Sequence, residues 1–314
     1  MSDLEIRPYD DADEDLVLGL LSSSLGWLPD ADHRAFFRWK HLANPAGRSA
    51  MWVAQANGVL VGFRAMLRWR FVVDGAEVEA VRAVDTATAP EARGLGVFQE
   101  LTLHALDELK SDGVAFVFNT PNDQSRPGYL KMGWRELGRP PAAIRPRGLK
   151  GAMRMAASRA PADLWSIETP VGQPAADVLD GDIAVGPPPP TGTVTQRSRE
   201  HLQWRYAGLP ALAYRGIRVD DGVALFRLRR RGRATEAALC ELLSPDEDRR
   251  RRLVREVARV AGADHVLRLG RAHARIGELP LPGGGPIVTW RDLTMSAPPP
   301  LDQWALSLGD VELL

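Results

Sequence analysis

Apolar and polar positions along residues 4–140 follow two different periods, which predicts both strands and helices. The segment 51–84 has the pattern of antiparallel strands that turn at Asn57-Gly58 and at Asp74-Gly75. Such dipeptides favour the left-handed backbone conformations that tight hairpins need. A further short strand is expected at residues 4–10, so the first part of the chain should form an antiparallel sheet.

The segment after these predicted strands has the spacing of an amphipathic helix. Between residues 98 and 109 apolar side chains recur every three or four positions, and Gly113 can end the helix that they predict. The next run, 114–118, is apolar throughout, which indicates a strand covered on both faces. Pro127 suits the first turn of a second, shorter helix.

The second half of the chain repeats landmarks of the first. Trp39-Lys40-His41 precede a proline by the same offset as Trp204-Arg205-Tyr206, and three further landmarks follow in matching order. Chance agreement among common residues would explain one match, whereas four in the same order favour an internal duplication. A Pro- and Gly-rich stretch separates the halves. We therefore expect two domains, at residues 1–165 and 195–314, joined by a linker at 166–194.

Composition narrows the range of partners. The chain has 40 basic and 40 acidic residues, so no basic field is available to hold a nucleic-acid backbone. Its one cysteine, Cys240, excludes an intrachain disulfide and a multi-cysteine metal site, and we expect it to be a small buried hydrophobe. No apolar run reaches the length of a membrane span, and the first residues do not resemble a secretory signal. These features predict a cytoplasmic protein with no nucleic-acid partner, no membrane partner and no metal.

The junction at Arg93-Gly94-Leu95-Gly96 carries the clearest candidate chemistry. It joins a strand to a helix, and a helix N-terminus exposes unpaired backbone N–H groups and a partial positive charge that attract phosphate. Glycines allow close approach of the anion, and the arginine adds a forked donor. An ordinary tight loop is the alternative interpretation. The P-loop motif is absent, and the dinucleotide fingerprint lacks its third glycine at Gln99.

Together these features resemble the GNAT N-acetyltransferase superfamily. The resemblance rests on the antiparallel strands, the Pro-x-x-Arg-Gly-x-Gly loop, the following helix and buried strand, Asn122, and the sequence GYLKMGW at 128–134. By resemblance the fold is α+β, with tandem GNAT-like domains that each hold a central mixed, mostly antiparallel sheet flanked by helices. The second half lacks the loop motif, and we expect it to be a degenerate domain that supports the first.

The resemblance implies binding of acetyl-coenzyme A (acetyl-CoA), whose pyrophosphate would rest on main-chain amides of the loop. These cofactor-binding residues are Arg93, Gly94, Leu95, Gly96, Val97 and Phe98. Phe98 departs from the family's usual glycine or alanine, but the phosphate needs only the backbone N–H, so the ring can pack inward. Ala87 and Thr88 would offer backbone groups to the pantetheine arm. Asn122 would contribute an amide contact, although an asparagine after a proline is also a common turn residue.

Catalytic roles follow the same resemblance. Tyr129 occupies the position of the general acid, and a tyrosine side chain can donate a proton to the departing thiolate. A packing role with an exposed hydroxyl is the alternative. Glu79 and Asp85 share one face of the predicted fourth strand and are candidates for a general base, or equally ordinary solvated residues. His33 and His41 lie where the early helices would wall the acceptor pocket, or are structural.

The leading hypothesis is an acetyl-CoA-dependent N-acetyltransferase acting on a primary amine of a small molecule, such as an amino sugar or an antibiotic. The amine would attack the thioester directly within a ternary complex. A non-catalytic acyl-CoA-binding or scaffolding protein with a vestigial site is the alternative, and a nicotinamide-dependent oxidoreductase ranks third. Nothing in the sequence identifies the amine.

Overall fold

The computed structural model describes residues 4–158, 160–181, 183, 185 and 191–312. They belong to two compact units, each assembled from separate stretches of the chain. The first unit comprises Met1–Phe71, Glu77–Leu137 and Val288–Pro299, and the second comprises Val72–Ala76, Gly138–Ile287 and Pro300–Leu314.

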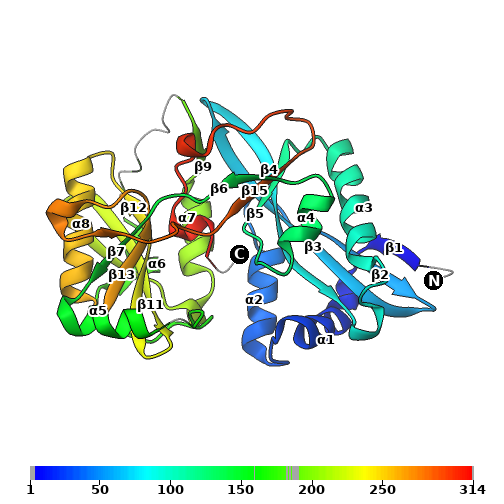
Figure 1. Ribbon diagram of the computed structural model, residues 1–314, viewed down its shortest axis with the longest axis horizontal. Helices are drawn as coiled ribbons and strands as arrows, with labels where there is room; N and C mark the ends of the chain where they lie inside the picture. Colours follow the sequence, from blue (N-terminus) through cyan, green and yellow to red (C-terminus); the bar gives the residue numbers. More distant parts are fainter. Residues whose placement is uncertain (1–3, 159, 182, 184, 186–190, 313–314) are drawn as a thin grey trace. The chain divides into compact units, whose positions relative to one another are not determined.

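The first unit is built on a mixed sheet with the strand order β1-β2-β3-β4-β5-β15-β6 (Figure 1). Its strands are β1 (Leu4–Pro8), β2 (Ala50–Ala56), β3 (Val59–Val73), β4 (Ala76–Thr88), β5 (Phe116–Asn119), β6 (Arg135–Gly138) and β15 (Val288–Asp292). Its helices are α1 (Glu14–Leu25), α2 (Ala31–His41), α3 (Val97–Ser111) and α4 (Arg126–Lys131). The two predicted hairpin turns are confirmed, since Asn57, Gly58, Asp74 and Gly75 all have positive φ.

Helices cover both faces of this sheet. Phe63 of β3 packs its ring against Phe37 of α2 (centroids 6.1 Å apart), whereas its neighbour Gly62 faces α3. Successive residues of a strand point to opposite faces, so α2 and α3 lie on opposite sides. A Cβ on Gly62 would come within 2.6 Å of Val97 and 2.7 Å of Leu101, and the glycine therefore allows α3 to lie close to β3.

The second unit repeats this plan. Its sheet has the order β8-β10-β11-β12-β13-β7-β14, which matches the first sheet strand for strand. Its strands are β7 (Ala142–Pro146), β8 (Gln173–Pro174), β10 (Arg215–Val219), β11 (Gly222–Arg231), β12 (Ala234–Leu243), β13 (His265–Leu269) and β14 (Leu279–Pro280). Its helices are α5 (Gly148–Ala157), α6 (Ala175–Leu179), α7 (Arg199–Ala207) and α8 (Glu247–Val260). The predicted α+β fold with two tandem sheets is confirmed.

Each unit receives one strand from the other half of the chain. β15 pairs antiparallel with β5 of the first sheet, while β7 pairs antiparallel with β13 of the second. The short strand β9 (Thr193–Thr195) adds a further pairing to β3. The compact units are therefore discontinuous, unlike the contiguous segments 1–165 and 195–314 predicted from the sequence. Hydrogen bonding between strand backbones does not depend on local sequence pattern, so the exchange leaves no signal there.

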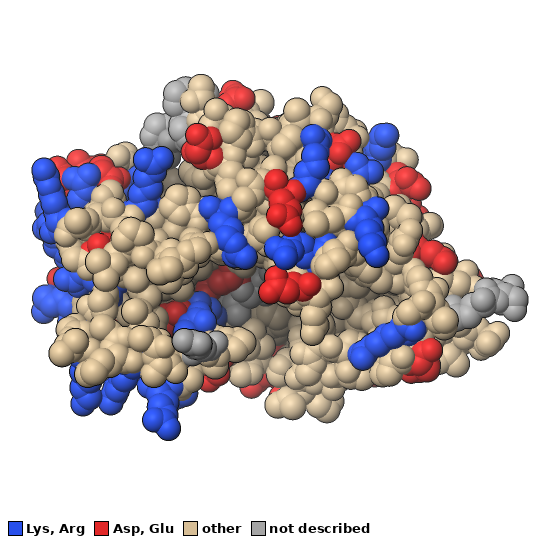
Figure 2. Space-filling view, viewed as in Figure 1, with Lys and Arg blue, Asp and Glu red and all other residues tan. Residues whose placement is uncertain are grey.

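Charges of both signs intermingle on the face of the molecule shown in Figure 2, in keeping with the balanced composition. Among the described residues, no helix combines the length and the apolar character that crossing a bilayer requires. Cys240 is buried, as predicted, and burial together with the nearby Glu312 charge raises the pKa of its thiol well above the usual value.

Candidate active site

The junction between β4 and α3 leaves the first turn of α3 open. After β4 ends at Thr88, the 3-10 turn η2 (Pro90–Ala92) leads through Gly94 and Gly96 into the helix at Val97. Both glycines have positive φ, 79° and 85°, a conformation that side chains disfavour. Gly96 is the N-cap residue, and no side chain caps the helix.

Main-chain donors therefore point out of α3 at this end. Within the described part of the chain, successive amides here have no hydrogen-bond acceptor: those of Gly96, Val97, Phe98 and Gln99. The first internal bond of the turn runs from Glu100 N to Gly96 O (3.0 Å). Unpaired N–H groups and the helix dipole suit an anion such as a phosphate, and the exposed Arg93 side chain adds a cation on the same loop.

The sheet opens beside this junction. β4 pairs in parallel with β5 at Val81 and Arg82, yet β4 continues for six residues to Thr88. The shorter β5 does not accompany these last residues, so the two strands separate. Ala87 is buried here, and the Thr88 carbonyl accepts a hydrogen bond from Ser24 Oγ (3.1 Å).

Helix α4 places Tyr129 next to the loop. Its ring packs edge-on against Phe98 (centroids 5.4 Å apart) and lies 5.0 Å from Trp134. Gly128 leaves room for this contact, because a Cβ there would lie 2.9 Å from the Phe98 ring. Phe98 thus presents its amide at the open turn and its side chain to Tyr129, which places the loop and the phenol in one site.

The hydroxyl of Tyr129 is held by an arginine that sequence reasoning missed. Nη1 of Arg64, on β3, donates a hydrogen bond to Tyr129 Oη (2.7 Å) and another to Thr86 Oγ1. Arg64 is fully buried, Tyr129 is 5% exposed, and the hydrogen bond between them is buried. The Tyr129 hydroxyl is therefore not exposed, as a simple packing role would predict it to be. In the sequence, an arginine between Phe63 and Ala65 resembles a residue on the solvent-exposed face of a strand. Its burial becomes apparent only in the structure, where helices cover both faces of β3.

Asn122 acts as a turn residue before α4. Its Oδ1 accepts hydrogen bonds from the amides of Gln124 (3.1 Å) and Ser125 (2.9 Å), and its carbonyl accepts one from Arg126 N (2.9 Å). This is the alternative that its position after a proline suggests. The side-chain Nδ2 donates to no described residue, so a contact with a ligand remains compatible with the turn.

Asp85 belongs to a buried ionic cluster. Its Oδ2 contacts Lys40 Nζ (2.9 Å) and His41 Nε2 (2.8 Å), both from α2, and His41 Nδ1 lies 2.9 Å from Ser49 Oγ. Burial alone would raise the pKa of Asp85, but the Lys40 charge and the His41 hydrogen bond outweigh it and lower the pKa well below the usual value. Burial lowers the pKa of His41, which Asp85 only partly offsets. The carboxylate is thus a weak proton acceptor, and the cluster fixes α2 to β4.

Two other sequence candidates do not join the site. Glu79 is exposed and precedes Asp85 by six residues, which corresponds to roughly 20 Å along a strand. Asp85 has a φ of 36°, which interrupts the extended backbone and hence the alternation that placed both carboxylates on one face. His33 is held structurally, since its Nδ1 lies 2.9 Å from the capping carboxylate of Asp30.

Among its described residues, the second unit has no equivalent open turn. Its helix α8 is capped by Asp246, whose carboxylate accepts a hydrogen bond from Arg249 N (2.6 Å). A carboxylate at this point satisfies the amides and repels an anion. The arginines at residues 249–252 form ion pairs with nearby acids rather than facing a glycine loop. This unit is degenerate as an anion site, as expected.

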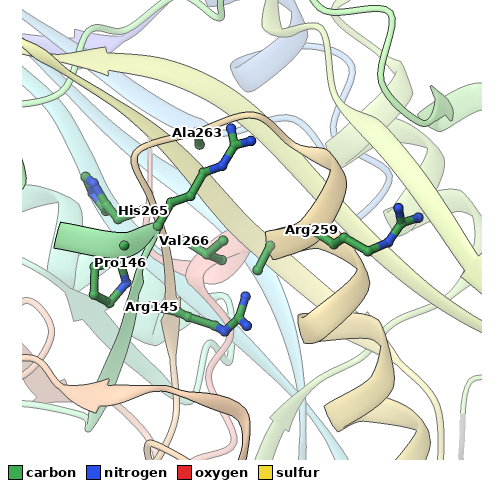
Figure 3. Close-up of a pocket in the computed structure, with 9 residues that line it drawn as sticks. Arg145, Pro146, Arg259, Ala263, His265 and Val266 are labelled. Atoms are coloured by element: carbon green, nitrogen blue, oxygen red, sulfur yellow. The ribbon is translucent and has the colours of Figure 1, made fainter. Parts of the chain in front are cut away.

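A cavity of about 300 Å³ lies elsewhere in the second unit, near the ends of β7 and α8 (Figure 3). Two of its three arginines are already engaged: Arg145 Nε donates to Ile276 O (2.6 Å), and Arg259, which extends away from Arg145 and His265, pairs with Glu256. His265 shares a hydrogen bond with Glu236 (3.0 Å). The open turn at α3 is therefore the stronger candidate site.

Comparison with known proteins agrees with this geometry. Residues 5–137 match the model of the acetyltransferase (GNAT) domain. This segment is a GNAT domain. It contains the open turn, the strand separation and Tyr129. The match confirms the superfamily that the sequence motifs suggested. No curated protein matches the chain significantly.

Solved structures resemble the whole two-unit chain. A probable N-acyltransferase from Enterococcus faecalis has a TM-score of 0.64 at 11% identity, over 94% of this chain and 74% of its own. A GCN5-related N-acetyltransferase from Kribbella flavida gives 0.61 at 16% identity, over 93% and 72%. Eis1 from Mycobacterium abscessus gives 0.58 at 14% identity, over 93% and 74%. At these identities the similarity establishes a shared fold, which extends beyond the GNAT domain into the second unit.

Proposed function

We propose that the protein is an acetyl-CoA-dependent N-acetyltransferase that acts on a primary amine of a small molecule, such as an amino sugar or an antibiotic. One observation carries the proposal: Phe98 joins an uncapped helix N-terminus to a buried tyrosine. The amides from Gly96 to Gln99, with Arg93 beside them, would hold the pyrophosphate. The separation of β4 from β5 at Ala87 and Thr88 would admit the pantetheine arm, and Asn122 would contact it through Nδ2.

The chain's own groups would then act on the thioester. The amine nitrogen forms a bond to the acyl carbon as the carbon–sulfur bond breaks, and that bond's electron pair stays on sulfur. Tyr129 gives its phenolic proton to the sulfur, and the proton lost by the nitrogen returns to the phenolate through water. Asp85 is a poor general base because its carboxylate is paired with Lys40 and His41. Glu79 lies too far along β4 to serve.

The proposal is tested by the release of free thiol from acetyl-CoA with a panel of small amines. We expect turnover by the wild type and a loss of about 10²- to 10⁴-fold in kcat for Tyr129→Phe. Tyr9→Phe is the matched control, since the Tyr9 hydroxyl is buried and makes no hydrogen bond among the described residues. Stabilisation by CoA without thiol release from any amine would instead support the non-catalytic acyl-CoA-binding alternative.

A further inference from the structure

Arg64 is a buried cation without an anion. Its side chain is fully buried, and no carboxylate of the described residues lies within ion-pairing distance of it. Its hydrogen bonds go to Tyr129, Thr86 and the sulfur of Met66 (3.7 Å), while its Nε has no hydrogen-bond partner in the described part of the chain. An unpaired buried charge is costly, so it persists in a fold mainly where the charge has a use.

Several other buried cations of the same chain are paired with carboxylates. Lys40 meets Asp85 at 2.9 Å, and in the second unit Arg227 and Arg229 meet the carboxylate of Glu312 at 3.2 and 3.1 Å. These pairs show that the fold supplies carboxylates to neutralise cations in its interior. Among the described residues, no carboxylate lies beside Arg64 in the same way, and its guanidinium contacts Tyr129 instead.

The direction of the hydrogen bond is fixed by chemistry. A guanidinium has only donors, so the phenolic oxygen of Tyr129 must accept from Arg64. The phenol's own proton is then free for a different acceptor. The guanidinium carbon also lies 5.4 Å from the Tyr129 ring centroid and 5.9 Å from that of Phe98, which holds the cation against both rings.

We infer that Arg64 is a positioning residue that directs the Tyr129 proton toward the leaving sulfur and stabilises the charge left behind. The inference rests on the proposed function. When the O–H bond breaks, its electron pair remains on the phenolic oxygen, the proton goes to sulfur, and the guanidinium keeps all its protons. The lone positive charge of Arg64 is compensated only while that oxygen is negative, so the interaction strengthens as the proton leaves.

A double-mutant cycle with Arg64→Met and Tyr129→Phe tests this inference. We expect Arg64→Met to lower kcat about 10- to 100-fold, a share of what general acid catalysis contributes, with the KM for acetyl-CoA changed less than about 2-fold. In the Tyr129→Phe background the same substitution should have no further effect on kcat. Arg64→Lys, which keeps the charge without the planar fork, should recover part of the lost rate.

Stability measurements separate this role from a structural one. Removing an unpaired buried charge should leave the melting temperature unchanged or higher, whereas a structural arginine would lower it. If Arg64→Met does not fold, the cycle is run with Arg64→Gln, which also removes the charge. An unchanged kcat, or an equal loss with and without the Tyr129 hydroxyl, overturns the inference and leaves the proposed function standing. A wild type that turns over no amine removes the proposed function itself.

Discussion

The contact between Gly62 and α3 makes a sharp prediction about the open turn. In Gly62→Ala the new methyl would lie 2.6 Å from Val97 Cγ1 and 2.7 Å from Leu101 Cδ1. Carbon atoms in contact normally lie about 3.5–4.0 Å apart, so roughly 1 Å must be recovered. Val97 and Leu101 are buried and have little space to turn away, so we expect α3 itself to shift outward at its first turn.

The cost follows from overpacking a buried contact. An extra methyl group in a filled core typically destabilises by about 1–3 kcal/mol, which lowers the melting temperature by roughly 2–10 °C for a chain of this size. Because Val97 is the first residue of α3, the shift also displaces the amides that would face the pyrophosphate. We expect the Kd for CoA to rise about 3- to 10-fold, roughly one lost hydrogen bond.

Thermal unfolding and calorimetric titration with CoA measure the two effects. Gly19→Ala is the matched control, since Gly19 lies within α1 and a Cβ there meets no atom within 4 Å. That variant should be as stable as the wild type or more so, because alanine favours a helix by about 1 kcal/mol. A Gly62→Ala protein with unchanged stability would refute the packing argument, and lower stability with unchanged CoA affinity would refute the link to the loop.

Three further predictions concern the surroundings of the site. Asp85→Asn leaves Lys40 buried without its carboxylate, so denaturant unfolding should show a loss of about 3–5 kcal/mol, and wild-type stability would contradict the cluster's role. Burial raises the pKa of Glu312, but surrounding arginines lower it to about 2; with the lowered pKa of Asp85, this predicts stability that is complete above about pH 4.5 and lost as the pH falls toward 2. Acid titration of the melting temperature measures this loss, and a flat profile over that range would contradict it. Gly128→Ala should displace the Phe98 ring from Tyr129 and lower kcat. The double variant Gly128→Ala, Phe98→Leu should recover part of the lost kcat, and a kcat that stays as low in the double variant would refute the steric explanation.

Local sequence patterns were sufficient where the structure depends on neighbours in the chain. The turns at Asn57-Gly58 and Asp74-Gly75 and the helix α3 follow from backbone preference and helical spacing. The predicted duplication agrees with the structure, because duplication preserves the order of elements and both sheets share one strand order. Gly94 and Gly96 pointed to the open turn because their positive φ requires glycine.

Features that depend on distant contacts were not accessible in this way. Asp85 and His41 were separate candidates, 44 positions apart, and only the packing of α2 on β4 unites them in one cluster. Arg64 resembled a solvated strand residue, because alternation cannot show that helices cover both faces of β3. The exchange of β7 and β15 between the sheets is likewise a matter of which edge each strand reaches.

The two units differ in how they treat the same physical problems. The second unit caps its helix α8 with Asp246 and pairs its buried arginines with the carboxylate of Glu312. The first leaves the start of α3 to Gly96, without a side-chain cap, although a capping side chain typically adds about 0.5–2 kcal/mol. It also leaves Arg64 without a carboxylate partner among the residues that the structure describes. Both features lie around Phe98 and Tyr129, and two stabilising groups missing at one place are what we would expect of the anion-binding active site proposed above.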